Sequence, residues 1–317
     1  MKKSFTFLFL AHVVLLLLTG VSSSFAQQAP EKIDLKDSVF SQALQISAMA
    51  VFKGDRYMAA EKCKLILMLD KDWNKTDVID LNQGILEGKP VEIEGMAVYK
   101  GHLLLTDEHA PAIYSMDLHN RKLTTVSTDQ EKRLGKDTGD FGLEGIAVDE
   151  ENGICYLLKE RNKDFQSEIR VFRIVIDAGS ISLKYLRNIL VDQEKLNKAP
   201  EGNTRYSDIY FDPAGKILYC LRSYYDRAEP SKSKYGVDAI AASDYTKIPA
   251  SAIDANKILY KDLSTKVATG YPGFNNNLEG MAIQDKKLYL VSDNFFGDRC
   301  CCDLLGQGKT LLLSVQQ

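Results

Sequence analysis

Carboxylate side chains recur at matched places in this sequence, each in front of a short apolar run. Glu94, Glu144 and Glu279 are each followed by glycine, and then by Met or Ile, Ala, and Val or Ile. Asp208 precedes a fourth apolar run, and Ser47 takes the acidic place in a first unit. Carboxylates that converge in a partly desolvated site repel one another, so they need compensation. The pattern predicts either an oxygen-rich site for a divalent cation or a closed network of ion pairs.

A second set of polar residues ends the next apolar run of each unit. The interval is 16 positions in one unit and 14 in four: Glu144 to Glu160, then Ser47 to Glu61, Glu94 to Glu108, Asp208 to Arg222 and Glu279 to Asp293. Residues placed this way lie near one another across antiparallel strands. We expect Asp293 or Glu108 to orient a water molecule and Arg222 to hold a substrate anion. Further substrate contacts are predicted for Arg161, Arg205 and Asn294, and the arginines are also candidates to neutralise the carboxylates.

In the metal hypothesis, four carboxylates hold a divalent cation, with calcium the expected ion: Glu94, Glu144, Asp208 and Glu279. The cation would polarise a carbonyl or phosphoryl oxygen and lower the pKa of a bound water. His109 is the one histidine placed to act as an acid or base, although its position in a connector beside Pro111 is typical of a surface histidine. The sequence has no Gly-x-Ser-x-Gly elbow, no His-Glu-x-x-His and no phosphate-binding glycine loop, so serine-hydrolase and zinc-protease readings lack support.

The elements that carry these residues are predicted to be β-hairpins, because short runs rich in Val, Ile, Leu and Tyr are joined by Gly, Asp and Pro turns. The inner runs are almost continuously apolar, whereas outer runs such as 168–174 alternate polar with apolar residues. The inner strands should therefore be buried on both faces and the outer ones on one face. This gradient predicts an all-β fold, a β-propeller of four-stranded blades around a central channel. Residues 32–35 are predicted to supply the last blade's missing outer strand and close the ring.

The number of blades is predicted from the spacing of equivalent positions. Met49, Met96 and Ile146 are 47 and 50 residues apart, and the next intervals, to Ile209 and Met281, are 63 and 72. Five blades with insertions would account for these intervals. Total length favours six, because the 232 residues from Met49 to Met281 divide into five steps of about 46. The expected start of the extra blade is Val237–Ala241, inside an expected insertion at 224–257.

The N-terminus predicts export. Lys2 and Lys3 precede a run from Phe7 to Leu18 that is apolar except for His12, and Ser24-Phe25-Ala26 then offers small residues for cleavage before Gln27. This is the layout of a secretory signal peptide over residues 1–26. Residues 27–317 then form a single domain, expected as a monomer in the periplasm or outside the cell. Without Lys2 and Lys3, the 40 basic residues become 38 against 43 acidic ones, a net charge of −5. A mildly acidic chain without a basic run is a poor nucleic-acid binder, and no later apolar segment is long enough to span a membrane.

The six cysteines are too few for a disulfide scaffold in a chain of 317 residues. Cys155 and Cys220 lie inside apolar runs and are interpreted as buried hydrophobic residues, and Cys63 is interpreted in the same way. The run at 300–302 is open to three interpretations: a loop disulfide, a soft-metal site or free thiols.

The repeated Glu-Gly-Met/Ile-Ala-Val/Ile hairpins, above all 277–283 followed by 288–295, resemble the phytase-like family of exported β-propellers, described by an esterase-like activity of phytase. The resemblance covers most of residues 40–317. It implies a six-bladed propeller, a calcium ion at the axis and ester or phosphoester hydrolysis of a small-molecule substrate. The carry-over reaches Glu94, Glu144 and Glu279, while Ser47 and the glycine-free Asp208 depart from the motif. The alternative is a non-catalytic propeller that recognises a sugar, a peptide or a protein partner.

Overall fold

The computed structural model describes most of the predicted domain. The described residues are 30–37, 40, 42–61, 63–129, 134, 142–160, 166–193, 204–224, 229, 233–242, 248, 251–263, 277–293, 301–305 and 310–316, with the backbone alone at 42–43 and 301–305. The predicted signal peptide, Arg161 and Asn294 lie outside them. No helix within the described ranges has the length and apolar character needed to span a bilayer.

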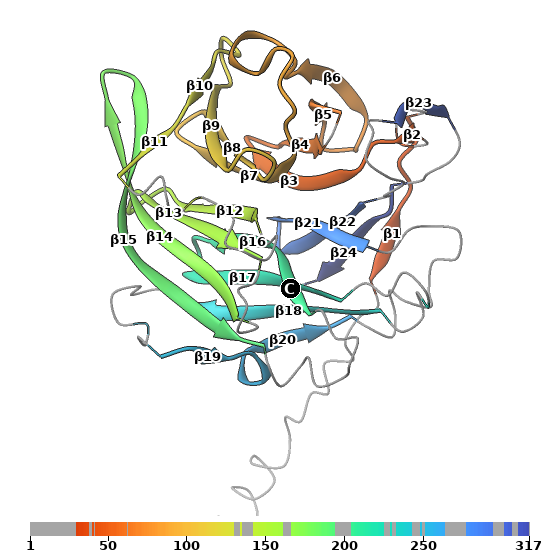
Figure 1. Cartoon of the computed structure of the whole chain (residues 1–317). Helices are drawn as coiled ribbons and strands as arrows, with labels where there is room; N and C mark the ends of the chain where they lie inside the picture. The colour runs from red at the N-terminus through yellow and green to blue at the C-terminus, as the bar shows by residue number, and fades with distance from the viewer. Residues whose placement is uncertain are drawn as a thin grey trace, which may run out of the picture.

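Five sheets, each built on four antiparallel strands, surround a common centre (Figure 1). The first two contain β3 (Ile46–Phe52), β4 (Asp55–Ala60), β5 (Leu65–Leu69) and β6 (Lys75–Asp80), then β7 (Ile93–Tyr99), β8 (His102–Asp107), β9 (Ala112–Asp117) and β10 (Leu123–Thr125). A short 3₁₀ helix, η2 (Gly84–Leu86), connects them. We call these sheets blades 1 and 2.

Blade 3 contains β12 (Leu143–Asp149), β13 (Ile154–Lys159), β14 (Gln166–Asp177) and β15 (Ser180–Asp192), with β11 (Ser127–Thr128) and β19 (Ile253–Asp254) paired in parallel to β15. Blade 4 contains β16 (Arg205–Asp212), β17 (Ile217–Tyr224), β18 (Lys234–Ala241) and β20 (Leu259–Asp262), with a second 3₁₀ helix, η5 (Ala255–Lys257), before β20. Outside the blades, β2 (Gln42–Ala43) pairs with β23 (Cys301–Leu305).

Blade 5 joins the two ends of the chain. Its inner strands are β21 (Asn277–Gln284) and β22 (Lys287–Asp293), followed outward by β24 (Leu312–Gln316) and β1 (Glu31–Ile33). β1 pairs with β24 in antiparallel register, with Lys32 opposite Leu313 (Figure 1). This confirms the predicted closure of the ring by a strand that precedes blade 1 in the sequence.

The described residues form five blades, and the prediction of six is wrong. The long 63-residue interval is filled by the extended β14–β15 hairpin of blade 3 and the connection that follows it. Residues 237–241 belong to β18, the third strand of blade 4, and do not start a blade. Dividing the length into equal steps failed because the extra residues lengthen existing strands and connections.

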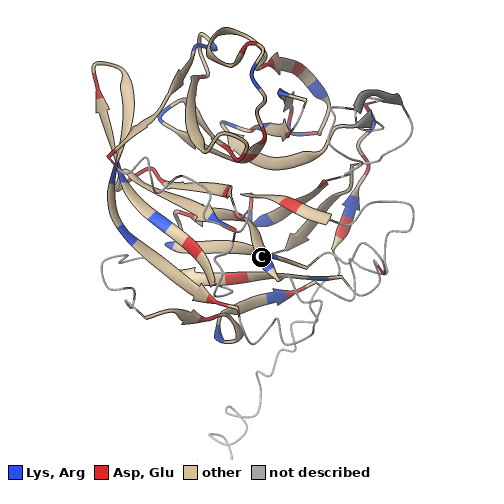
Figure 2. Cartoon of the chain, in the orientation of Figure 1, with Lys and Arg blue, Asp and Glu red and all other residues tan. Residues whose placement is uncertain are grey.

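The innermost strands form the wall of the channel. They contact one another in the order β3, β7, β12, β16, β21 and back to β3. The apolar faces between blades form the core, as when Tyr156 of β13 stacks on Phe211 of β16. The strands are therefore rigid supports for whatever side chains face the axis. Basic and acidic residues are interspersed over the blades, and no continuous basic stripe is visible in the view of Figure 2.

The cysteines divide into two kinds. Cys155 and Cys220 are buried free thiols, as predicted, and burial raises the pKa of both. Cys63 is disulfide-bonded, so its interpretation as a simple buried hydrophobic residue is wrong. The side chains of the predicted cysteine run at 300–302 lie outside the described part of the structure.

Candidate functional site

A β-bulge near the start of each innermost strand places one residue per blade at the same end of the channel. In blade 2, Ile93 pairs with Asp107 and Gly95 with Thr106, which leaves Glu94 without a partner on β8. A bulge of this kind re-aims a side chain. The residues at the five bulges are Ser47, Glu94, Glu144, Ser207 and Glu279.

Glycine after the bulge lets neighbouring inner strands approach closely. A Cβ on Gly95 would lie 2.7 Å from the Glu144 carbonyl oxygen, and a Cβ on Gly145 would lie 2.9 Å from the backbone nitrogen of Ile209. A Cβ on Gly280 would lie 3.2 Å from the backbone of Ala48. The glutamate-glycine motif is therefore explained by the narrowness of the ring at this level.

The structure corrects the position of Asp208. Register places Ser207 at the bulge of blade 4, so Asp208 occupies the position of the glycines. Its Oδ2 accepts a hydrogen bond from the Met281 backbone N–H at 2.7 Å, and its Oδ1 accepts one from the Ile209 N–H at 2.8 Å. Burial raises the pKa of Asp208. Asp208 links blades 4 and 5 and does not join Glu94, Glu144 and Glu279.

The position of Arg222 is corrected for the same reason. In blade 4, four residues separate the paired Asp212 and Ile217 at the turn between β16 and β17. The corresponding turn of blade 3, between Asp149 and Ile154, is equally long. The residue opposite Arg205 is therefore Ser223, and Arg222 points to the other side of the strand. The sequence alignment used Asp208 where the structure has Ser207, and Arg222 where the structure has Ser223. The true interval is therefore 16 residues, and the predicted one was 14.

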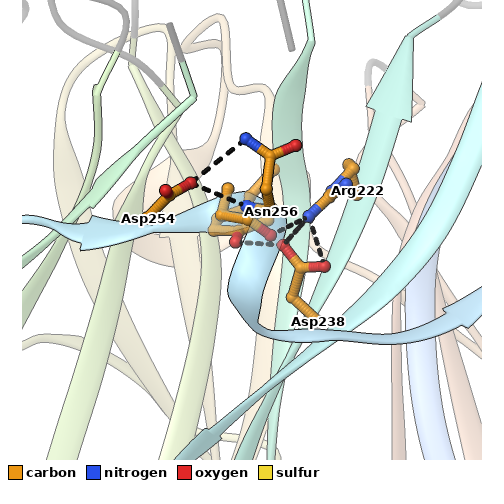
Figure 3. A network of polar contacts seen from close by, with 6 residues as sticks. Arg222, Asp238, Asp254 and Asn256 are labelled. Carbon is orange, nitrogen blue, oxygen red and sulfur yellow. Dashed lines mark hydrogen bonds and ion pairs between the residues drawn. The ribbon is translucent and has the colours of Figure 1, made fainter. Parts of the chain in front are cut away.

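Arg222 is held in a network within blade 4 (Figure 3). Its Nη2 donates to Asp238 Oδ1 at 2.6 Å and to the Ala255 carbonyl oxygen at 2.7 Å, and its Nε donates to Asp238 Oδ2. The Tyr206 hydroxyl donates to the same carboxylate. Asp254 caps η5 by accepting from the Asn256 N–H at 3.0 Å, which fixes the backbone that Arg222 contacts. Arg222 therefore stabilises the blade.

A cationic side chain lies among the carboxylates of the channel mouth. Arg205 donates from Nη1 to Glu160 Oε1 at 2.6 Å and from Nη2 to Glu279 Oε1 at 2.9 Å. Glu279 Oε1 also accepts from Asn277 Nδ2 at 2.6 Å. Burial lowers the pKa of Arg205, but Glu160, Glu144 and Glu279 outweigh this effect and raise it overall. Arg205 was predicted either to contact the substrate or to neutralise the carboxylates, and its ion pairs show the neutralising role.

Glu94 and Glu144 are the electrostatically perturbed acids of this mouth. Burial raises the pKa of Glu94 well above its ordinary value, and repulsion from Glu61, Glu144, Glu279 and Glu108 adds to the rise. Burial and Glu160 also raise the pKa of Glu144 well above its ordinary value, although Arg205 offsets part of that rise. The two acids differ in one cationic neighbour: Arg205 favours the ionised form of Glu144 and is not among the main influences on the pKa of Glu94.

Three further predicted residues, Glu108, Asp293 and His109, lie in the described part of the chain. Glu108 lies against Gly142 of the next blade, where an added Cβ would overlap its side chain. Asp293 ends β22 opposite Asn277 and is buried. His109 is largely exposed, with its Nδ1 4.0 Å from a Glu92 oxygen, as expected of a surface histidine.

Two serines complete the same ring: Ser47, which the sequence analysis aligned with the acidic positions, and Ser207, which it missed. The Ser47 hydroxyl donates to the Ile93 carbonyl oxygen, and the Ser207 hydroxyl donates to the Leu278 carbonyl oxygen at 3.0 Å. Each ties its blade to a neighbouring one. The four-residue turn of blade 4 was the signal that would have aligned Ser207 correctly.

A calcium site fits the chemistry of these donors but not their arrangement. Carboxylate oxygens suit a hard cation. Within the described ranges, however, no group of three or more His, Cys, Asp or Glu side chains is arranged to hold a metal ion. Asp208 is turned away, and Arg205 pairs with Glu279, another of the predicted ligands. Calcium binding stays a prediction that the described residues do not support.

The fold and the site define a class: a β-propeller with an acidic mouth at one end of its channel. The family model for Phytase-like proteins, described as "Esterase-like activity of phytase", matches residues 32–296. The chain belongs to this family, as the sequence motif predicted. No curated protein matches the chain significantly.

Solved structures resemble the chain at low identity. Glutaminyl cyclase of Myxococcus xanthus is 11% identical with a TM-score of 0.47, over 90% of this chain and 95% of that one. A luciferin-regenerating enzyme is 13% identical with a TM-score of 0.43, over 86% and 76%. A streptogramin B lyase is 9% identical with a TM-score of 0.38, over 93% and 100%. Likenesses this distant carry no argument about function.

Proposed function

We propose that the acidic mouth is the active site of an ester hydrolase, in which Glu94 is the general acid and Glu144 the general base. The observation that supports this assignment is the pair itself, two buried carboxyl groups from adjacent blades of which only Glu144 has Arg205 as a principal influence on its pKa. Family membership agrees with hydrolysis of an ester.

The proposed reaction needs Glu94 protonated and Glu144 ionised, and Arg205 favours the ionised form of Glu144. The Glu144 carboxylate takes a proton from water, and the resulting hydroxide attacks the ester carbonyl carbon. The bond from that carbon to the alcohol oxygen then breaks, and Glu94 donates its proton to the departing alkoxide. Arg205, held by Glu160 and Glu279, is placed to stabilise negative charge on the carbonyl oxygen. Each carboxyl group is restored by proton exchange with water.

The charge of the mouth bears on the substrate class. Arg205 pairs with Glu160 and Glu279, two of the seven acidic residues that end the inner strands or lie at their bulges. The other five are Glu61, Glu94, Glu108, Glu144 and Asp293. A phosphoester would be repelled here unless a cation accompanied it. We therefore propose carboxylic esters as substrates, with phosphoesters hydrolysed when a divalent cation such as calcium binds.

The proposal is tested by assaying carboxylic esters and phosphoesters on the purified protein, with calcium and with a chelator. Glu94→Gln and Glu144→Gln should each lower kcat about 100-fold or more, because proton transfer by a positioned group contributes about 10²–10⁴. The exposed Glu87→Gln is the matched control. Activity should fall at low pH, when Glu144 is protonated, and at high pH, when Glu94 is ionised. Wild-type protein without activity on either class would favour the non-catalytic binding role instead.

We also propose that the protein is exported with residues 1–26 removed. The disulfide at Cys63 supports this, because such bonds persist mainly in oxidising compartments. Expression of the full chain with N-terminal sequencing of the exported product should give a start near Gln27. Recovery of the intact chain in the cytoplasm would contradict the proposal.

A further inference from the structure

The end of the channel away from the acidic mouth opens into an apolar cavity of about 420 Å³. The ends of β3, β7, β12 and β16 that lie farthest from the bulges line it. Pockets for small molecules commonly have volumes of about 300–1,000 Å³ and apolar walls. The proposed hydrolase reaction makes no use of this cavity.

The walls repeat the same chemistry in three blades. Residues 49–51, 96–98 and 146–148 each place a Met or Ile, an Ala and a Val along the cavity. Aromatic residues of blades 1 and 4 complete the wall, namely Phe52, Tyr210 and Phe211. The Tyr210 hydroxyl donates to the Ile283 carbonyl oxygen at 3.1 Å, which fixes this ring against blade 5. The alanines in the middle of each set leave the central space open.

The charged groups that line the cavity are acidic. Glu150 and Glu151 lie on the turn between β12 and β13. Glu151 is paired with Lys216 of blade 4. The Glu150 carboxylate accepts the Lys100 backbone N–H at 3.2 Å, and no basic side chain of the described residues pairs with it. Lys53 lies over the Phe52 ring, 5.0 Å from its centroid, and is absent from the lining residues.

We propose that this cavity binds an apolar organic cation, with its hydrocarbon part between the blades and its ammonium group beside Glu150. The apolar walls stabilise the hydrocarbon part by removing it from water. Lys53 and Lys216 already lie over the Phe52 and Phe211 rings, so the charge that would attract the ligand's ammonium group is that of Glu150. A carboxylate ligand of the same shape would instead face the Glu150 carboxylate, because Glu151 is paired with Lys216. This site is separate from the acidic mouth, so it does not depend on hydrolase activity.

The test is calorimetric titration of the intact protein at pH 7 with three probes of similar shape: octyltrimethylammonium, octanol and octanoate. We expect the cation to bind about 2–5-fold more tightly than the alcohol, as a partly exposed ion pair supplies about 0.5–1 kcal/mol. Octanoate should bind most weakly. Val98→Trp, which fills the cavity from a partly exposed position, should abolish binding of all three.

Glu150→Gln separates the charge from the cavity. It should remove the advantage of the cation over the alcohol and leave octanol binding unchanged, whereas the matched Glu87→Gln should change neither. Glu150 is exposed, so this variant is expected to fold. If none of the three probes binds, or if binding survives Val98→Trp in a folded variant, the proposed site is wrong. Preference for octanoate, or a cation advantage that survives Glu150→Gln, would overturn the proposed ligand class.

Discussion

Glu94 contributes to stability in a way that depends on pH. Its pKa in the folded protein is raised by burial and by neighbouring carboxyl groups, whereas in the unfolded chain a glutamate ionises near pH 4.3. The folded state therefore binds the proton more tightly. Its favourable effect is fully present below the unfolded pKa and is lost as the pH rises towards the folded pKa.

We therefore predict that Glu94→Gln raises the free energy of unfolding at pH 7 by about 1 kcal/mol or more, since one pKa unit corresponds to about 1.4 kcal/mol. At pH 4 the change should be close to zero, because the carboxyl group is then largely protonated in both states. Urea unfolding at the two pH values measures the difference, with Glu87→Gln as the control. Destabilisation at pH 7, or an equal effect at both pH values, would contradict the assigned electrostatics.

Individual site residues were predictable to different degrees. Glu94, Glu144 and Glu279 were found because glutamate and glycine recur together, and the glycine marks the narrow part of the ring. Asp208 and Arg222 were misplaced because acidic and basic residues stood by chance one position from the true ring positions. In a strand, a shift of one residue reverses the side chain's direction. Residue types alone could not reveal this one-residue shift in blade 4, but the length of its turn could.

At the scale of elements, the bulge and the glycine form one device that positions the acids. The bulge turns the glutamate towards the axis, and the glycine lets the next inner strand approach. At Gly95, an added Cβ would lie 2.7 Å from the Glu144 carbonyl oxygen and 2.7 Å from Thr106 Oγ1. Since the first neighbour is backbone, the two inner strands would have to separate.

Gly95→Ala should therefore lower the free energy of unfolding by about 2 kcal/mol or more, within the range of about 1–3 kcal/mol usual for overpacking. It should also reduce esterase activity, because Glu94 and Glu144 flank the displaced contact. Chemical unfolding and the ester assay measure the two effects. Gly54→Ala is the control, as its added Cβ meets no atom within 4 Å and only the positive φ of 92° opposes it. An equal loss in both variants would contradict the close-approach explanation.

The strand hairpins themselves were predicted well, because continuous apolar runs separated by turn residues distinguish inner strands from loops. The number of blades was not, because β14 and β15 are 12 and 13 residues long and β18 resembles the start of a unit. Strand length and connection length vary independently of blade number, so an average period does not count blades. Counting blades requires knowing which strands pair with which, and the spacing of the apolar runs does not specify that pairing.

At the scale of the whole molecule, stability depends on joining the two ends of the chain. β1 covers the outer edge of β24, and the partly buried Ile33 and Leu35 pack against the core between blades 1 and 5. Without β1, blade 5 would expose an unpaired edge beside the first blade. β24 carries the apolar residues Leu312, Leu313 and Val315. Once β1 no longer covers its outer edge, the unpaired backbone groups of β24 could pair with another chain.

Removal of residues up to and including 36 should therefore lower the free energy of unfolding by about 2–4 kcal/mol relative to a chain that starts at residue 27, the scale of losing one or two partly buried aliphatic side chains with their strand pairing. It should also produce dimers or larger species, through strand exchange at the exposed edge. Thermal unfolding and size-exclusion chromatography measure the two effects. The double variant Glu31→Gln with Lys32→Gln keeps the backbone of β1 and should behave as the wild type does. A deleted chain that stays monomeric and equally stable would mean that contacts among the other blades suffice to hold the ring closed.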